Sequence, residues 1–304
     1  MNKIKRIINN PYWILYYFLL ATKVSRITPD KWYLKLQYRC FFNKKLNLKN
    51  PKSFNEKLQW LKLYDRKPEY IKMVDKHEVK QYVANIIGEE YIIPTLGIWD
   101  KFDDIDFDKL PMQFVLKCTH DSGSTIICSD KSKFDFSVAK QKLSNFLKNS
   151  HYLPSREWPY KNIKPKIICE KYIEDVSGAE LKDYKFMSFN GEVKCLFVCL
   201  NRRKITGLNV DFYDMEWLPM PFERHYANSG TLIPRPKFFD KMVEFSEKLS
   251  KNIPFVRVDF YETNGKLYFG ELTFFPGSGW EEFTPEEWDY KLGSMIKLPM
   301  NKVY

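Results

Sequence analysis

The sequence has few of the residues that bind transition metals or form disulfide bonds. Histidine occurs only four times in 304 residues, which argues against a zinc enzyme. No C-x-x-C spacing occurs among the six cysteines, most of which lie in apolar, strand-like segments: Cys40, Cys118, Cys128, Cys169, Cys195 and Cys199. We therefore expect reduced thiols in the core of a cytoplasmic protein.

Long basic runs, repeats and low-complexity segments are also missing. Lys and Arg number 49 against 38 Asp and Glu, a net charge of +11. This balance favours an anionic partner such as phosphate, an acidic polysaccharide or anionic lipid. No run of five or six basic residues occurs, and there is no zinc-finger or RNA-recognition signature, so we expect no nucleic acid partner.

The longest apolar run is short. It covers residues 11–21, PYWILYYFLLA, with lysines and arginines on both sides. A helix that spans a bilayer needs about 20 apolar residues, and no small-residue cleavage site follows this run. Two interpretations stay open. The segment is either a core helix, or a helix on anionic lipid at the inner face of the plasma membrane, with Trp13, Tyr16 and Tyr17 at headgroup depth.

Capping patterns and apolar spacing predict most of the regular structure. Ser53, Asp75 and Thr284 are each followed three residues later by glutamate, which predicts helices over 54–64, 76–87 and 286–296. Apolar spacing predicts two more helices, over 135–149 and 236–251. Strand composition covers 113–118, 124–129 and 166–173, and hairpins are expected around Asn190-Gly191 and Asn264-Gly265.

This order of elements is typical of an α+β protein. Because it contains no long βαβαβ alternation, a doubly wound nicotinamide-binding sheet is excluded. We expect a helical N-terminal extension (1–50), a helical subdomain (51–110), a small α+β subdomain (111–175) and a larger antiparallel one (176–304). The Pro-, Asn- and Arg-rich segments 151–165 and 201–235 are expected to be mobile loops.

Charged residues interrupt the C-terminal hairpin RVDFYETNGKLYFGELT, residues 257–273. A two-residue loop at Asn264-Gly265 would put the carboxylates of Asp259 and Glu271 on opposite faces. We expect instead a three-residue loop with a glycine bulge, which pairs Asp259 with Glu271 and Arg257 with Thr273. Facing carboxylates repel unless a cation lies between them. The hairpin therefore indicates either a site for Mg²⁺ and phosphate or an ordinary cross-strand ion pair.

Further segments carry residues suited to binding a nucleotide. Lys117 lies near the end of an apolar strand, and the small residues 122–124 follow in a turn whose N–H groups suit phosphate oxygens. Lys76 lies at the predicted start of a helix, where the positive end of the helix dipole disfavours a lysine unless an anion binds there. The strand that leads to residues 170–173 offers adenine an apolar slot. Each pattern also occurs in ordinary solvent-exposed elements.

Taken in order, Asp75-Lys76, FVLK with its turn, ICEKYI and RVDF…GELTFFPGSG resemble the ATP-grasp superfamily, the fold of D-alanine–D-alanine ligase. The similarity extends from about residue 50 to about 298. It is closest to the TupA-like branch, which is found in gene clusters for bacterial surface polysaccharides. The resemblance implies two α+β subdomains with mainly antiparallel sheets that grip ATP between them.

The resemblance also implies roles for the matched residues. ATP would be bound by Lys76, Lys117, Ser122, Gly123, Ser124, Glu170, Lys171, Tyr172, Ile173 and Lys185. Arg257 and Lys117 would contact the transferred phosphate, and Mg²⁺ would be held by Asp259, Glu271 and Thr273. Many members have asparagine where this chain has Thr273, so the second ion is expected to be held less firmly or through water.

The implied reaction is amide formation. The γ-phosphoryl group of ATP activates a carboxylate, and an amine attacks the acyl phosphate. In this branch, the expected substrates are a carboxylated sugar or polysaccharide precursor of the uronic-acid type and an amino acid or amine. Arg202-Arg203-Lys204 is a candidate contact for the substrate carboxylate, and the candidates for the ribose are Glu174, Asp175, Glu180 and Asp183.

Two other functions remain open from the sequence. Asp104-Ile-Asp106 and Asp106-Phe-Asp108 match the D-x-D pattern of glycosyltransferases that use a nucleotide sugar. No apolar strand precedes this stretch, however, and a transferase gives Arg257, Asp259 and Glu271 no role. A catalytically silent nucleotide-binding protein is the third hypothesis, because Thr273 departs from the common pattern.

Overall fold

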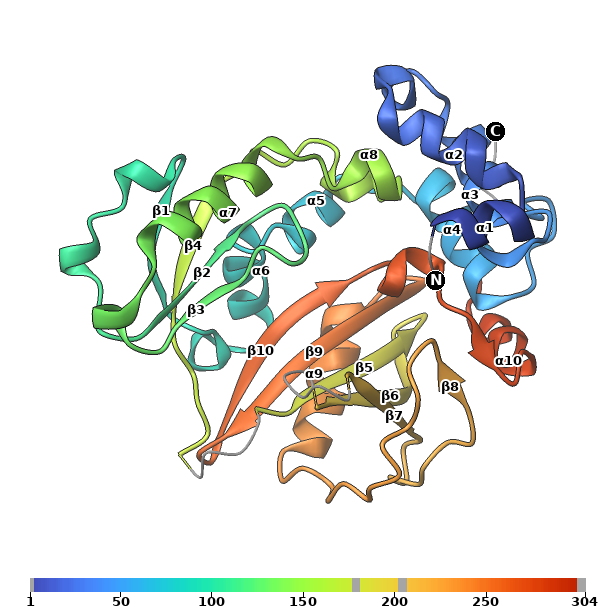
Figure 1. Cartoon of the computed structure of the whole chain (residues 1–304). Helices are drawn as coiled ribbons and strands as arrows, with labels where there is room; N and C mark the ends of the chain where they lie inside the picture. Colours follow the sequence, from blue (N-terminus) through green and yellow to red (C-terminus); the bar gives the residue numbers. More distant parts are fainter. Residues whose placement is uncertain (1–2, 177–180, 202–206, 300–304) are drawn as a thin grey trace.

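The computed structural model of the chain describes residues 3–176, 181–201 and 207–299. Arg202-Arg203-Lys204 and Glu180 lie outside the described residues. Two antiparallel sheets face each other across the middle of the molecule, and the N-terminal helices lie on the far side from the small sheet (Figure 1). The expected α+β class is confirmed.

The helices gather at the N-terminus and around the two sheets. Their bounds are α1 Lys3–Asn9, α2 Tyr12–Ala21, α3 Asp30–Phe42, α4 Phe54–Tyr64, α5 Glu69–Val74, α6 Glu78–Ile87, α7 Phe136–Lys148, α8 Tyr152–Ser155, α9 Phe239–Ser250 and α10 Glu287–Met295. The capping box at Ser53 and Glu56 is present, as predicted. Asp75 accepts from the N–H groups of His77 and Glu78, but Thr284 caps no helix, because α10 begins at Glu287.

The strands form a small sheet, a large sheet and a short two-stranded pair. The small sheet has the order β1-β4-β2-β3 and the large sheet β10-β9-β5-β6-β7, while β8 pairs with β11. Their bounds are β1 Thr95–Trp99, β2 Phe114–Cys118, β3 Ile126–Cys128, β4 Ile167–Lys171, β5 Asp183–Phe189, β6 Glu192–Leu200, β7 Asn209–Tyr213, β8 Glu223–Arg224, β9 Phe255–Thr263, β10 Lys266–Thr273 and β11 Phe283–Thr284. Every pairing is antiparallel.

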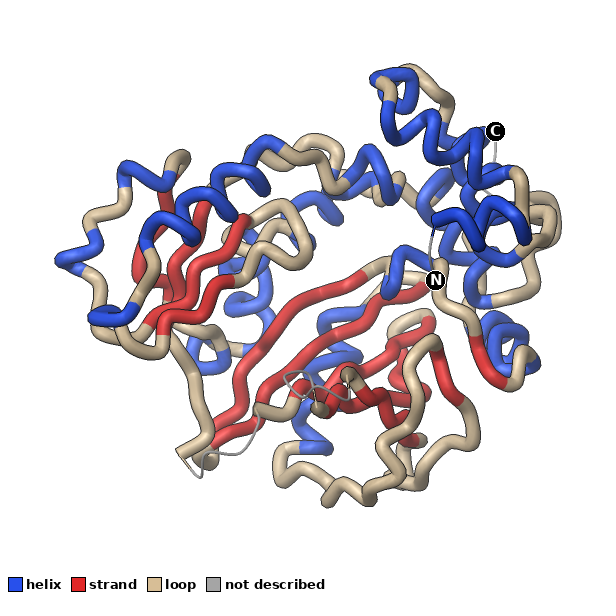
Figure 2. Tube along the Cα trace, in the orientation of Figure 1, coloured by secondary structure: helices blue, strands red, loops and turns tan. Residues whose placement is uncertain are grey.

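Each sheet has its own hydrophobic core. Helix α9 packs against β5, β6 and β9, and α7 packs against β2. Figure 2 shows the two groups of strands separated by helix and loop. The core of the small sheet includes Phe114, Leu116 and Leu143, whereas Phe186, Val258 and Phe260 belong to the core of the large sheet. All six cysteines are free and buried, as expected.

The turn predicted for the C-terminal hairpin is wrong, but the strand pairing predicted at its charged end is right. Thr263 pairs with Lys266, so Asn264-Gly265 is a two-residue loop, and both residues have positive φ. A β-bulge between Phe269 and Leu272 then shifts the register, which leaves Arg257 opposite Thr273. Bulges re-aim side chains in this way. Asp259 and Glu271 therefore point to one side, where both contact Arg257.

The segments expected to be loops contain regular structure as well. Helix α8 lies within 151–165, and strands β7 and β8 lie within 201–235. In α2, Trp13 and Tyr16 are buried against α3, so they do not lie at headgroup depth. No helix in the described parts of the chain has both the length and the apolar character needed to cross a membrane.

Candidate active site

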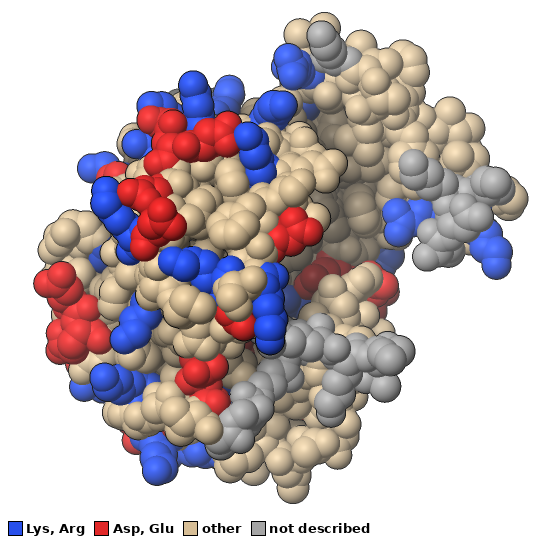
Figure 3. Space-filling view, turned by 60° about the vertical axis from the view of Figure 1, so that its left-hand side comes forward, with Lys and Arg blue, Asp and Glu red and all other residues tan. Residues whose placement is uncertain are grey.

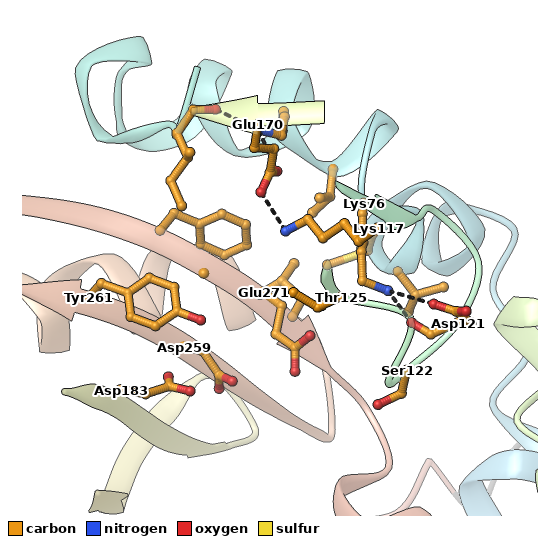
Figure 4. A pocket seen from close by; sticks show the side chains of 18 of the residues that line it. Lys76, Lys117, Asp121, Ser122, Thr125, Glu170, Asp183, Asp259, Tyr261 and Glu271 are labelled. Atoms are coloured by element: carbon orange, nitrogen blue, oxygen red, sulfur yellow. Dashed lines mark hydrogen bonds and ion pairs between the residues drawn. The ribbon is translucent and has the colours of Figure 1, made fainter. Parts of the chain in front are cut away.

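A cleft of about 260 Å³ lies between the two sheets. It is bounded by α5 and α6, the turn after β2, strand β4, and strands β5, β9 and β10. Eight of the predicted site residues line it: Lys76, Lys117, Ser122, Gly123, Glu170, Lys185, Asp259 and Glu271. Figure 4 shows lysines on the side of the small sheet and the carboxylates of Asp183, Asp259 and Glu271 on the opposite side. The sequence patterns thus converge on one cavity.

The side of the cleft next to the small sheet, here called the lysine wall, is formed by Lys76, Lys80, Lys117, Asp121 and Glu170. The buried carboxylate of Glu170 holds two cations, with Lys80 Nζ at 2.7 Å and Lys117 Nζ at 2.5 Å. Lys76 Nζ donates to the backbone oxygen of Asp121. Three lysines against two carboxylates leave this wall with a surplus positive charge.

Burial and ion pairing act against each other in the lysine wall. Burial lowers the pKa of Lys76 and of Lys80, because it disfavours their charged forms. For the Glu170 carboxyl, burial raises the pKa, but Lys117 and Lys80 outweigh it and hold the pKa below its ordinary value. Glu170 is therefore ionised at neutral pH and keeps both lysines in place.

The opposite side of the cleft, here called the carboxylate wall, is formed by Asp183, Lys185, Arg257, Asp259 and Glu271. Arg257 donates to both oxygens of Asp259 at 2.6 Å and to Glu271 Oε1 at 2.7 Å. Lys185 Nζ lies 2.7 Å from Asp183 Oδ2 and also donates to Asp259. Three carboxylates against two cations leave this wall with a surplus negative charge.

Glu271 is the accessible acid of the carboxylate wall. Its side chain is 47% exposed, against 1% for Asp259. Burial raises the pKa of Glu271, but Arg257, Lys185 and Lys76 lower it to about 2. Thr273 Oγ1 donates to Glu271 Oε1 at 2.8 Å. Glu271 is thus an ionised oxygen donor that faces the cleft.

The turn after β2 is stabilised by hydrogen bonds of the buried Ser124 side chain. Ser124 accepts a hydrogen bond from the Cys118 N–H at 2.8 Å and donates to Asp121 Oδ1 at 2.7 Å. Ser122 and Gly123 line the cleft, whereas Ser124 is buried behind it. Gly123 has a φ of +98°, which favours glycine at this point of the turn. Ser124 therefore shapes the turn, and the preceding residues face the cavity.

Other predicted site residues lie beside the cleft. Arg257 and Thr273 reach it through their hydrogen bonds to Glu271. Lys171 and Ile173 line a neighbouring pocket with Pro94 and Tyr268. Tyr172 is absent from the lining of either pocket as far as the described residues show.

Sequence reasoning missed several residues that line the cleft. Lys80 lies four residues after Lys76, which in the predicted helix 76–87 puts both side chains on one side, so this signal was available; in the structure Lys76 precedes α6, and both lysines line the cleft. Tyr160 and Tyr261 line the cleft as well. Tyr160 comes from a short 3₁₀-helix, Trp158–Tyr160, and no local pattern marks it. Apolar residues complete the lining: Met73, Val74, Val79, Ile92, Ile93, Phe269 and Leu272.

Tyr160 lines the cleft and lies close to a buried acid, Glu157, that does not line it. Burial raises the pKa of Tyr160, and the carboxylates of Glu157 and Glu271 add to this effect. Glu157 accepts a hydrogen bond from the Ser278 hydroxyl. Lys62 donates to Ser278 O at 2.8 Å, and Gln59 donates to Gly279 O at 3.0 Å. The loop after β10 is therefore held at Ser278 and Gly279 by side chains of α4 and by Glu157.

The carboxylates of Asp259 and Glu271 suit a Mg²⁺ ion that is also bound by phosphate groups. Among the described residues, no group of three or more His, Cys, Asp or Glu is arranged to hold a metal on its own. Mg²⁺ is commonly bound by one or two carboxylates together with substrate phosphates, so no all-protein cage is needed. Asp259 and Glu271 share one guanidinium, and Glu271 is accessible, so these two fit the requirement.

The acidic stretch considered for a sugar transferase lies elsewhere. Asp106 caps a short 3₁₀-helix by accepting from the Asp108 N–H. Asp104, Asp106 and Asp108 are exposed and do not line the cleft. The capping role of Asp106, together with the distance of this stretch from the cleft lining, accounts for the pattern without a metal.

Three solved structures give the scale of the structural similarity. D-alanine–D-alanine ligase from Bacillus anthracis, solved with ATP, is 16% identical over 76% of this chain and 66% of its own, with a TM-score of 0.42. The enzyme from Helicobacter pylori is 12% identical over 81% and 70%, with a TM-score of 0.41. The ATP-grasp ligase PsnB, solved with minimal precursor, Mg and ADP, is 8% identical over 83% and 64%, with a TM-score of 0.39.

The chain thus spans about two thirds of the length of these enzymes, and the likeness is weak. No curated protein sequence matches it. The assignment rests instead on the family model of TupA-like ATP-grasp proteins, which matches residues 56–297. That range contains both walls of the cleft and covers well over half of the sequence, and the cofactors of an ATP-grasp protein are ATP and Mg²⁺. The chain therefore belongs to the TupA-like ATP-grasp family.

Proposed function

We propose that this protein is an ATP-dependent ligase that joins a carboxylate to an amine through an acyl phosphate. The observation that carries the proposal is the pair of oppositely charged walls in one cleft. A nucleotide with Mg²⁺ offers negative phosphates to one wall and a divalent cation to the other. In this proposal the subdomains that grip ATP are 111–175 and 176–304, preceded by helical regions over 1–50 and 51–110.

The lysine wall binds and orients the phosphates. Lys76 and Lys117 contact phosphate oxygens, and the N–H groups of the turn at Ser122 and Gly123 cover the chain of phosphates. Glu170 holds Lys80 and Lys117 in position, so little reorganisation is needed when the nucleotide enters. The apolar residues of α5, α6 and β10 suit the adenine, beside residues 170–173.

The carboxylate wall holds the metal and neutralises developing charge. Asp259 and Glu271, with Thr273 beside them, hold Mg²⁺, which offsets the charge of the phosphates. Arg257 has its guanidinium fixed by Asp259 and contacts the transferred phosphoryl group. The γ-phosphorus bonds to a carboxylate oxygen and its bond to ADP breaks. The amine nitrogen then bonds to the acyl carbon and loses a proton, and phosphate leaves.

The substrates proposed are a carboxylated sugar or polysaccharide precursor of the uronic-acid type and an amino acid or amine. This proposal follows from the family and its association with surface-polysaccharide gene clusters. The net charge gives it little support, because residues 1–50 carry +10 of the total of +11 and the remainder only +1. The reaction needs ATP, so a cytoplasmic location, peripheral to the inner face of the plasma membrane, is part of the proposal.

A trapping experiment tests the reaction without knowledge of the amine. The protein is incubated with Mg²⁺, ATP, hydroxylamine and a panel of uronic acids and amino acids. We expect ADP and a hydroxamate from at least one carboxylate, because hydroxylamine captures an acyl phosphate. Glu271→Gln, which replaces an accessible carboxylate of the metal site, should form neither product.

Nucleotide preference separates the ligase from a transferase and from a silent binder. Ligands that bind only the native state raise the melting temperature. We expect a Mg²⁺-dependent rise with ATP and ADP and none with UDP or UDP-sugars. A rise with UDP compounds alone would overturn the proposal. ATP binding without ADP or hydroxamate formation for any carboxylate would indicate a catalytically silent protein.

A further inference from the structure

Helix α2 (Tyr12–Ala21) is apolar on every side, but only one side is covered. Trp13, Tyr16 and Leu19 are buried against α3, where they contact Tyr33 and other core residues. The opposite side remains exposed. An α-helix that is apolar all round is normally buried on all sides, in a core or in lipid. The exposed side of α2 therefore lacks an occupant.

The exposed apolar residues form a continuous face on the helix. Ile14, Leu15 and Phe18 are 57%, 39% and 54% exposed, and Phe18 follows Leu15 by three and Ile14 by four positions, so it lies next to both on one side of the helix. Ile8 before the helix and Ile27 after it are 74% and 82% exposed. We call the set of Ile8, Ile14, Leu15, Phe18 and Ile27 the N-terminal apolar face. The N-terminal helices form the lobe at the upper right of Figure 1. The lobe at the upper right of Figure 3 shows few charged side chains.

The same part of the chain holds almost all of the net charge. Residues 1–50 contain eleven Lys and Arg and a single acidic residue, Asp30. No basic run marks this excess, because the cations are separated by apolar residues. Lys5, Arg26, Lys31 and Lys35 are exposed cations of the same N-terminal region, and none of the four forms an ion pair within the described part of the chain.

The one acid of this region is turned inward. Asp30 accepts from Arg66 Nη2 at 2.7 Å and from the Tyr152 hydroxyl at 2.7 Å, and Arg156 Nε lies 3.4 Å away. Its charge is thus balanced by residues of the protein interior. The surface around the apolar face therefore combines exposed hydrocarbon with uncompensated positive charge.

We propose that the N-terminal apolar face docks on an anionic lipid membrane. Apolar and aromatic side chains enter the boundary between headgroups and acyl chains, and flanking lysines and arginines contact anionic headgroups. A second copy of the chain fits less well, because two such surfaces would bring like charges together. The docking surface is independent of the ligase chemistry, and it supplies the contact that a peripheral location requires.

Vesicle sedimentation with two matched variants tests the proposal. Ile14→Asp and Val138→Asp both introduce a carboxylate three residues into a helix, at sites that are 57% and 58% exposed. Helix α7, which contains Val138, belongs to the small-sheet region, away from the N-terminal lobe (Figure 1). The two variants are therefore matched in chemistry, exposure and position in the helix.

We expect the wild-type chain and Val138→Asp to sediment with vesicles that contain phosphatidylglycerol, and far less with vesicles of phosphatidylcholine alone. Ile14→Asp should reduce the partition coefficient about tenfold or more. The double variant Arg26→Glu/Lys31→Glu, which leaves the apolar face intact, should reduce binding to the anionic vesicles, and added salt should do the same.

Several results would overturn the proposal. The first is equal sedimentation with both kinds of vesicle, and the second is equal vesicle binding by Ile14→Asp and Val138→Asp. The third is a wild-type protein that does not bind vesicles but forms a dimer, which Ile14→Asp dissociates. The melting-temperature rise with ATP is measured on every variant. If Ile14→Asp keeps that rise and loses only vesicle binding, docking is tested separately from the nucleotide site.

Discussion

The two walls of the cleft carry opposite surplus charges, and each is stabilised by a group of the other sign. In the lysine wall, Lys80 and Lys117 share the single carboxylate of Glu170. In the carboxylate wall, Arg257 is shared by Asp259 and Glu271. In each wall, a group of the minority sign thus pairs with two neighbours of the majority sign, and the wall as a whole keeps a surplus of the majority sign.

This difference explains how charges can be buried before any ligand binds. Isolated buried charges are strongly unfavourable, whereas paired and hydrogen-bonded ones are tolerated. Glu170 and Arg257 supply the pairing, and the surplus on each wall is what a Mg²⁺–nucleotide complex would neutralise. Breaking each wall should therefore affect stability and nucleotide binding to different extents.

Removal of Arg257 should have the largest effect. Arg257→Met leaves the buried Asp259 with Lys185 alone, and breaking a buried ion pair by removing one partner costs about 3 kcal/mol or more in the free energy of unfolding. Urea denaturation measures this. Arg235→Met is the matched control, because the Arg235–Asp240 pair is exposed, and such a pair contributes less than about 1 kcal/mol. Similar losses in both variants would contradict the account of the carboxylate wall.

Removal of Lys117 should weaken the lysine wall without unfolding it. Glu170 keeps Lys80 as a partner in Lys117→Met, and Lys117 makes one ion pair where Arg257 makes three hydrogen bonds, so the melting temperature should fall less than in Arg257→Met. Affinity for ATP should fall about ten- to a hundredfold, since a hydrogen bond to a charged group contributes about 1.5–3 kcal/mol. Titration calorimetry measures the affinity. Lys140→Met, which breaks an exposed pair with Asp103, should bind ATP as the wild type does, and an unchanged affinity in Lys117→Met would remove Lys117 from the phosphate site.

Replacement of Thr273 by asparagine should make the carboxylate wall bind Mg²⁺ more tightly. Thr273→Asn replaces a hydroxyl that donates to Glu271 with a side chain whose amide oxygen can bind a cation. We expect the Mg²⁺ concentration for half-maximal ATP binding to fall about threefold. Thr273→Val, which has no oxygen at this position, is the control and should show no such fall. A rise in both variants would mean that the threonine hydroxyl itself is needed.

The smallest effect should be a change in acid stability at Glu271. Its pKa of about 2 in the folded chain lies below the ordinary value of 4.5. The ionised group therefore stabilises the fold above about pH 4.5, and this contribution is lost as the pH falls toward 2. The loss should be small, because the side chain is 47% exposed. Wild type should lose stability relative to Glu271→Gln over this range in urea titrations, and parallel pH profiles would contradict the assigned ion pairing.

Sequence patterns predicted the elements that have capping or turn residues at their ends or a regular spacing of apolar residues. The capping box at Ser53 gave the start of α4, and strand composition with the two Asn-Gly turns found β2, β4 and both hairpins of the large sheet. Strand β1 and strand β7 were missed. Strand β1 pairs with β4, which lies some 70 residues later in the chain, so its stability comes from a contact that no local window contains.

The site was predicted in part for the same reason. Lys76, Lys117, Asp259 and Glu271 carry recognisable neighbours in the sequence, and the structure brings them to one cleft. Ser124 carries the same local signal as Ser122 and Gly123, yet it faces inward to Cys118 and Asp121. Tyr160 carries no signal at all. Which side of a turn faces a ligand depends on packing beneath the turn.

The sequence by itself determined the family, the α+β class, the charged residues of the two walls and the concentration of positive charge in residues 1–50. Only the tertiary structure decided how those charges meet. The bulge between Phe269 and Leu272 corrects the register set by the Asn264-Gly265 loop and turns Glu271 toward Arg257. Local sequence fixes propensities and turn types, but the pairing of distant charges depends on strand register and burial, which are settled when the sheets pack.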